Sequence, residues 1–170
     1  RAYNEQALRI FREVGDRRRE SRVLNLLGEL LRHQGRSAEA KHHYEQTLHV
    51  AREIGYRRGE GIALCNLSLL CHRLGESKAA LEYSQLTLAI AQEIGGRSFQ
   101  GYALTNLGHA LAELSHLTEA AESYQQALEI RRRLGQHSLI METLTGLALV
   151  SLAQDDLPQA RVHVEEILEL

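Results

Sequence analysis

The stretch RSFQGYALTNLGHALAELSHLTEAAESYQQALEIRRRLGQ, residues 97–136, decides the fold of this chain, because its pattern recurs along the whole sequence. The 40 residues before it, 57–96, keep the same spacing without an insertion or deletion. Four positions hold the period from end to end: Gly15, Gly55, Gly95 and Gly135; Leu24, Leu64, Leu104 and Leu144; Leu27, Leu67, Leu107 and Leu147; Ala40, Ala80, Ala120 and Ala160. A fixed period in this range is typical of solenoids, whose units bury their apolar faces against their neighbours.

Each unit contains two helical patterns. In residues 17–34, Leu24, Leu27 and Leu31 are three or four apart, which places an apolar stripe on one helical face. Residues 38–54 repeat that spacing, and Gly55 suits the left-handed position after a helix. A turn too short for anything but an antiparallel hairpin joins the two. The sequence thus predicts about eight helices: first helices near 17–34, 57–74, 97–114 and 137–153, second helices near 38–54, 77–94, 117–134 and 157–170, and a lone second helix in 1–16.

Small residues recur where the two helices of a hairpin should meet. One phase of the first helix holds Gly28, Ser68, Gly108 and Ala148, and one phase of the second holds the repeated alanines. Small side chains at both phases let two helices approach closely, so a large residue at either should overpack the hairpin.

These residues resemble the tetratricopeptide repeat (TPR). The match lies in Leu27-Gly28, Leu107-Gly108, the repeated alanines, Tyr44 and Tyr124. The resemblance implies an all-α, right-handed superhelix of antiparallel helix pairs. It covers 1–170 as a single solenoid, with a partial repeat in 1–16, full repeats in 17–56, 57–96 and 97–136, and a final repeat in 137–170. Forty-residue units resemble the spindle adaptor LGN/Pins and, equally, the sensor arrays of bacterial STAND-type ATPases and MalT-like activators.

Composition argues against several classes of protein. The formal net charge is −2, which gives no electrostatic reason to expect a nucleic-acid partner. No apolar run approaches the roughly 20 residues of a membrane span. Cys65 and Cys71 point apart on one predicted helix, so we expect no disulfide and a reducing, cytoplasmic setting.

The resemblance also implies a concave groove lined by first helices. Its predicted peptide-binding residues are polar ones out of phase with the leucines, followed by an apolar end at Thr145, Leu149 and Leu152. Asn66 and Asn106 share one phase, so they would bond either a peptide backbone or the neighbouring helix. Arginines there would hold carboxylates or simply be solvated. The predicted set is Arg22, Asn25, Arg32, Asn66, His72, Arg73, Tyr102, Asn106 and His109.

No pattern indicates catalysis. His42, His43 and His49 lack metalloprotease spacing, the glycines end helices rather than cradle phosphate, and the run Arg131–Arg133 is explained by a helix carboxyl end. We therefore expect no enzyme, metal or cofactor, and a protein- or peptide-binding scaffold of a signalling or regulatory protein. The alternative is a ligand-sensing domain of a bacterial STAND-type ATPase or transcriptional regulator. Ile167, Leu168 and Leu170 need covering, which predicts a fragment of a longer array and self-association through its ends.

Overall fold

A computed structural model describes residues 2–170 and shows nothing but helices and turns in that range. The all-α solenoid is confirmed, with nine helices in the described chain where the sequence predicted about eight. Their bounds are α1 Ala2–Glu13, α2 Arg17–His33, α3 Ser37–Glu53, α4 Arg57–Arg73, α5 Ser77–Glu93, α6 Arg97–Glu113, α7 Leu117–Arg133, α8 His137–Ala153 and α9 Leu157–Leu168.

The turns follow a shorter period than the side chains do. Helices α2 to α8 are each 17 residues long, and a three-residue turn separates each from the next. The backbone enters the left-handed region about every 20 residues, at six glycines and also at Ser115 (φ 63°) and Asp155 (φ 59°). The 40-residue period of the sequence therefore reflects alternate helices with different neighbours, strung on a nearly uniform helix–turn backbone.

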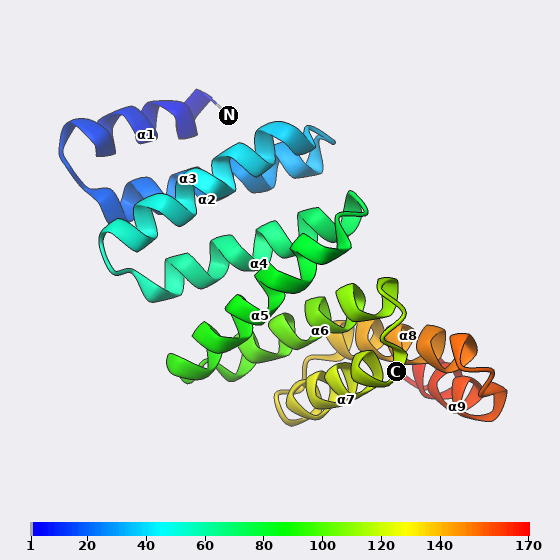
Figure 1. Ribbon diagram of the computed structural model, residues 1–170. Helices are drawn as coiled ribbons and strands as arrows, with labels where there is room; N and C mark the ends of the chain where they lie inside the picture. Colours follow the sequence, from blue (N-terminus) through cyan, green and yellow to red (C-terminus); the bar gives the residue numbers. More distant parts are fainter. Residues whose placement is uncertain (1) are drawn as a thin grey trace.

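The helices stack in chain order, from α1 at the upper left of Figure 1 to α9 at the lower right. Successive helices pack as antiparallel neighbours, and α2, α4, α6 and α8 also contact one another across the repeats. No such direct contact joins α3, α5, α7 and α9 within the described chain. The first series, here called the inner helices, is therefore more closely spaced than the second, the outer helices, so the array curves with the inner helices on its concave side.

Aromatic rings explain the small residues inside the hairpins. A Cβ added at Gly28 would lie 2.6 Å from the Tyr44 ring, and one at Gly108 would lie 2.7 Å from the Tyr124 ring. Both tyrosines are buried, so neither ring has open space into which to retreat. The predicted close approach of the two helices is confirmed, with a tyrosine seated on each glycine.

The second full repeat reaches the same packing with different residues. Ser68 replaces the glycine and Ser84 replaces the tyrosine, and their hydroxyl oxygens lie 2.7 Å apart. Both hydroxyls also donate to the carbonyl oxygen of Ala80, so no buried polar atom of the pair lacks a partner. A small polar pair thus fills the space that a glycine and a tyrosine fill on either side.

Ion pairs tie the first two junctions between repeats. A buried glutamate in the first turn of an inner helix, 2% exposed at Glu20 and 7% at Glu60, accepts from two arginines. Arg17 and Arg57 also reach the carboxylates of Glu53 and Glu93 one helix further on. At the third junction the equivalent of the buried glutamate is Gln100, which donates to the carbonyl oxygen of Ala91 at 3.2 Å. Charge pairing therefore holds the amino-terminal part of the stack and is replaced further along.

Candidate functional site

Hollows line the inner-helix side of the array at two places. Two adjoining hollows follow the amino-terminal ends of α2, α4 and α6, with volumes of ≈ 470 and ≈ 510 Å³. Another, of ≈ 480 Å³, lies near the carboxyl-terminal ends of α4, α6 and α8. Each is within the size range of ligand sites in proteins. We call the first pair the arginine trough and the second the histidine hollow.

The arginine trough is continuous, because Arg58 and Ile62 line both of its hollows. It contains Arg18, Arg22 and Arg58 at one end and Arg58 with Arg97 at the other. The guanidinium of Arg18 lies 4.7 Å from the ring centroid of Tyr56, a cation–π contact. Neither hollow is lined by any described aspartate or glutamate, so positive charge dominates here although the chain as a whole carries a formal charge of −2.

The histidine hollow combines an apolar wall with a pair of stacked rings. Leu149, Val150 and Ala153 of α8 supply the wall. His72 of α4 stacks on His109 of α6, with ring centroids 4.8 Å apart and an interplanar angle of 11°. The Nδ1 atom of His72 lies 2.7 Å from Glu113 Oε1. Burial, and then the neighbouring His109, lower the pKa of His72, and this outweighs the opposite effect of Glu113.

Beneath the stacked rings, Tyr124 connects the hollow to the core. Its hydroxyl lies 2.7 Å from His109 Nδ1, and burial raises the pKa of the phenol well above its usual range. A neutral His109 ring that accepts from this hydroxyl carries its proton on Nε2, which faces Glu142 Oε1 at 3.9 Å. The contact with His109, and then Arg131, lowers the pKa of Glu142 despite partial burial. The cluster is suited to orienting a ligand group.

Arg131 corrects a sequence-based interpretation. Its two neighbours in the run are half-exposed or more, but Arg131 is only 1% exposed and lies between α7 and α8. It donates to the carbonyl oxygen of Leu139 and, at 2.5 Å, to Thr143 Oγ1, and it lies 5.6 Å from the Tyr102 ring centroid. The helix-end explanation is therefore wrong for Arg131, which stands in the core position that Ala51 and Ala91 occupy in earlier repeats.

With this geometry in place, comparison with known proteins identifies the family. The tetratricopeptide repeat model matches residues 1–53, 19–93 and 99–170. The chain belongs to the tetratricopeptide repeat family. A sequence comparison with curated proteins finds no match.

Solved structures agree on the TPR fold. The apo form of RapI matches with a TM-score of 0.83 at 20% identity over 95% of this chain, and aspartyl phosphate phosphatase F from Bacillus subtilis with 0.85 at 12% over 99%. A Rap protein complexed with Competence and Sporulation Factor matches with 0.81 at 14% over 89%. This chain spans 46%, 44% and 42% of those chains respectively, which is less than half of each. At such identities the likeness concerns the fold alone.

The TPR array separates the nine predicted site residues into groups. Arg22, Asn25 and Tyr102 line the arginine trough, and His72 and His109 line the histidine hollow. Arg32 and Arg73 line neither. Their assignment to a binding site stays a prediction.

Asn66 and Asn106 are half-buried and connect inner helices. The side-chain amide of Asn66 donates to Asn25 Oδ1 at 2.8 Å, and that of Asn106 donates to the Cys65 carbonyl oxygen at 3.3 Å. Neither residue lines the trough or the histidine hollow. These bonds fit the predicted alternative in which each amide bonds the neighbouring helix, while the two Oδ1 atoms keep acceptor capacity.

Several lining residues were not singled out in the sequence. Arg58 and Arg97 belong to the trough, and Glu142 and Tyr124 to the histidine hollow. The phase of the repeat supplies a signal for some of them, because Glu142 is the 40-residue equivalent of Arg22 and Tyr102. Arg58 is likewise equivalent to Arg18, which we interpreted as solvated near a turn.

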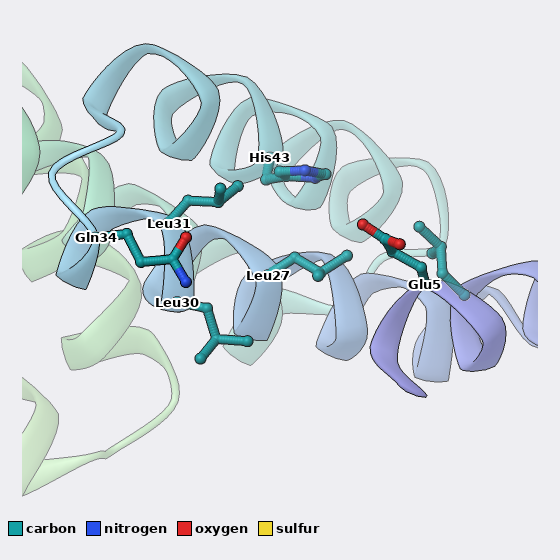
Figure 2. A pocket seen from close by; sticks show the side chains of 7 residues that line it. Glu5, Leu27, Leu30, Leu31, Gln34 and His43 are labelled. Atoms are coloured by element: carbon teal, nitrogen blue, oxygen red, sulfur yellow. The ribbon is translucent and has the colours of Figure 1, made fainter. Parts of the chain in front are cut away.

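A smaller hollow at the first repeat has a different character. Figure 2 shows Leu27, Leu30 and Leu31 of α2 with Gln34, facing Glu5 of α1 and His43 of α3. Its volume of ≈ 110 Å³ is well below the usual range of ligand sites. We interpret it as a packing gap and not as a functional site.

Two searches of the described residues bear on other classes of site. No three His, Cys, Asp or Glu side chains within residues 2–170 converge in a way that could hold a metal ion. None of the helices described above is both long and apolar enough to cross a bilayer.

Proposed function

We propose that this TPR array is a non-catalytic scaffold that binds a protein or peptide partner in its concave groove, within a cytoplasmic signalling or regulatory protein. The observation that carries the proposal is the placement of the trough and the histidine hollow on the same series of inner helices. An extended segment crossing those helices would meet cationic, amide and apolar groups in turn. TPR modules are built for such recognition, since a stacked array presents a long continuous surface.

The chemistry of the groove favours recognition over reaction. The pKa of the Cys65 thiol is raised to about 12 and that of Cys71 to about 11, mainly by burial, so neither is an activated nucleophile. Around the histidine pair stand carboxylates, a buried phenol and an apolar wall. These groups can orient and desolvate a bound side chain, and the partner would supply the complementary apolar residue.

A selection from a displayed random peptide library tests this function. Leu149 is 62% exposed on the apolar wall of the histidine hollow, so Leu149→Glu should leave the fold intact and weaken captured peptides by about tenfold or more. Leu157→Glu is the matched control, because Leu157 is 67% exposed and lines none of the hollows described here. Peptides that bind the Leu149 variant as tightly as the parent chain would contradict the proposal.

A ligand-sensing role is the second candidate, and the size of the histidine hollow favours it. At ≈ 480 Å³, with an apolar wall and a few polar groups, the hollow fits a small molecule as well as a side chain. In that case the ligand would alter the pitch of the array and signal to an attached ATPase or DNA-binding domain. A metabolite that raises the melting temperature and changes the scattering radius, without any peptide doing so, would favour the sensor.

A further inference from the structure

We propose that the arginine trough receives an acidic segment of the bound peptide, through side-chain carboxylates. This inference rests on the proposed peptide-binding function and adds the chemistry of the partner and the direction in which it lies. The acidic part would cross the amino-terminal ends of α2, α4 and α6, and the apolar part would lie toward the histidine hollow.

The pairing of arginines across the molecule carries the argument. Ten arginines of the described chain form ion pairs with carboxylates, whereas seven do not. Four of those seven line the trough: Arg18, Arg22, Arg58 and Arg97. On other faces the chain supplies its own acids, and here it supplies none.

The position of these charges makes a joint ligand geometrically reasonable. Arg18 and Arg22 are one helical turn apart on α2, and Arg58 starts the next inner helix and is shared by both parts of the trough. The amino-terminal ends of α4 and α6 open on the same side, so their dipoles add to the positive potential. Guanidinium groups bind carboxylates in paired hydrogen bonds, which a solvated lysine cluster would not provide.

Neighbouring groups sharpen the preference. Tyr56 holds Arg18 through its ring, and Tyr102 lines the far part of the trough beside Arg97. Asn25 of the trough receives a hydrogen bond from Asn66, so the amide row meets the cationic one. At the opposite end of the groove, Glu113 and Glu142 would repel acids, which fixes the orientation of an acidic segment.

The probe is an acetylated and amidated peptide in which Glu alternates with Ala. A length of about eight residues suffices, since three helices spaced by about 10 Å span roughly 20 Å and an extended chain advances about 3.3 Å per residue. We expect fluorescence anisotropy to show binding that weakens with salt, and a Gln-for-Glu peptide to bind roughly tenfold more weakly.

The double variant Arg22→Gln with Arg58→Gln should weaken the Glu peptide about tenfold and leave the Gln peptide unchanged. The control, Arg133→Gln with Arg161→Gln, removes the same charge from exposed pairs that line no hollow, and should change binding by less than about twofold. Equal binding of the Glu and Gln peptides overturns the inference, as does equal weakening by the control variant.

Two further arms exclude other sources of negative charge. A Gln peptide with a free carboxyl terminus that binds as well as the Glu peptide would assign the trough to a chain end and overturn the acidic segment. A single-stranded oligonucleotide of equal charge that binds more tightly, and is released by the same Arg22/Arg58 variant, would also overturn it. If the acidic arms fail while library peptides still depend on Leu149, only this inference falls. If both fail, the proposed function falls with it.

Discussion

At the scale of single residues, the tightest constraint is a ring held between two glycines. The Tyr124 ring lies against Gly108 of its own hairpin and Gly146 of the next inner helix, and a Cβ at either would lie within 2.7 Å of a ring atom. The ring therefore cannot move away from one glycine without meeting the other. This is why a small residue at each place is a packing requirement.

We predict that Gly108→Ala lowers the free energy of unfolding by about 1–3 kcal/mol, because the new methyl group overpacks the ring. Gly101→Ala is the control in the same helix. Its Cβ would meet nothing closer than 3.6 Å, so the alanine should be neutral or stabilise by up to about 1 kcal/mol through lower chain entropy. Urea unfolding measures both, and equal effects of the two substitutions would refute the packing account.

The residues also show where sequence reasoning succeeds and where it stops. Gly28 and Gly108 were predicted as contact points because their phase recurs, and recurrence reports packing between adjacent helices. Arg131 was misread, because a cation near a helix carboxyl end has a sufficient local explanation that hides its burial. Its alignment with Ala51 and Ala91 was the missing signal. For Asn66, recurrence could not show which of two neighbours its amide would meet.

At the scale of elements, one hairpin can be compared with its neighbours as a natural exchange of parts. Ser68 and Ser84 stand where Gly108 and Tyr124 stand one repeat later. If the backbone of the repeats is interchangeable, then a glycine–tyrosine pair should fit in the second full repeat as well. The backbone of Ser68 already lies in the same helical phase, so only the side chains need to change.

We predict strong coupling between these two positions. Ser84→Tyr alone should cost about 1–3 kcal/mol by overpacking against Ser68, and Ser68→Gly alone roughly 1 kcal/mol through lost hydroxyl bonds and a more flexible helix. Together they should recover at least about 1 kcal/mol relative to the sum of the single changes. Chemical denaturation of the four proteins completes the cycle, and additive effects would show that the repeats are not interchangeable.

The junction ion pairs give a second prediction for elements. Arg57 binds the buried Glu60 and also Glu93, whereas its 40-residue equivalent Arg97 forms no ion pair. Arg57→Gln should therefore lower the melting temperature, and Arg97→Gln should leave it nearly unchanged. Scanning calorimetry at low and high salt tests this, because the Arg57 effect should shrink as salt screens its exposed contact with Glu93. A larger loss from Arg97→Gln would contradict the ladder.

At the scale of the whole molecule, acid should loosen the array. Burial lowers the pKa of His72, which faces His109, Glu113 and Arg73, and it also lowers the pKa of His163. Between the lowered values and the unfolded value of about 6.5, the unfolded chain binds more protons, so stability falls as the pH drops below that value. We expect a lower melting temperature at pH 5.5 than at pH 7.5.

The variant His72→Gln with His163→Gln should flatten this dependence on pH. An unchanged slope would assign the effect to other groups. Exposed apolar residues at the last helix, Leu168 above all, are a separate property of the whole chain, and self-association through them stays a prediction. Sedimentation at rising concentration is the corresponding check.

The central claim is that the inner helices form the recognition surface, and amide chemical-shift mapping tests it most directly. A peptide captured from the library would be titrated into isotope-labelled protein, and each shifted amide would be assigned to its helix. The account predicts shifts concentrated on α2, α4, α6 and α8, beginning at the arginine trough when the peptide is acidic. Shifts concentrated on the outer helices α3, α5, α7 and α9 would contradict it.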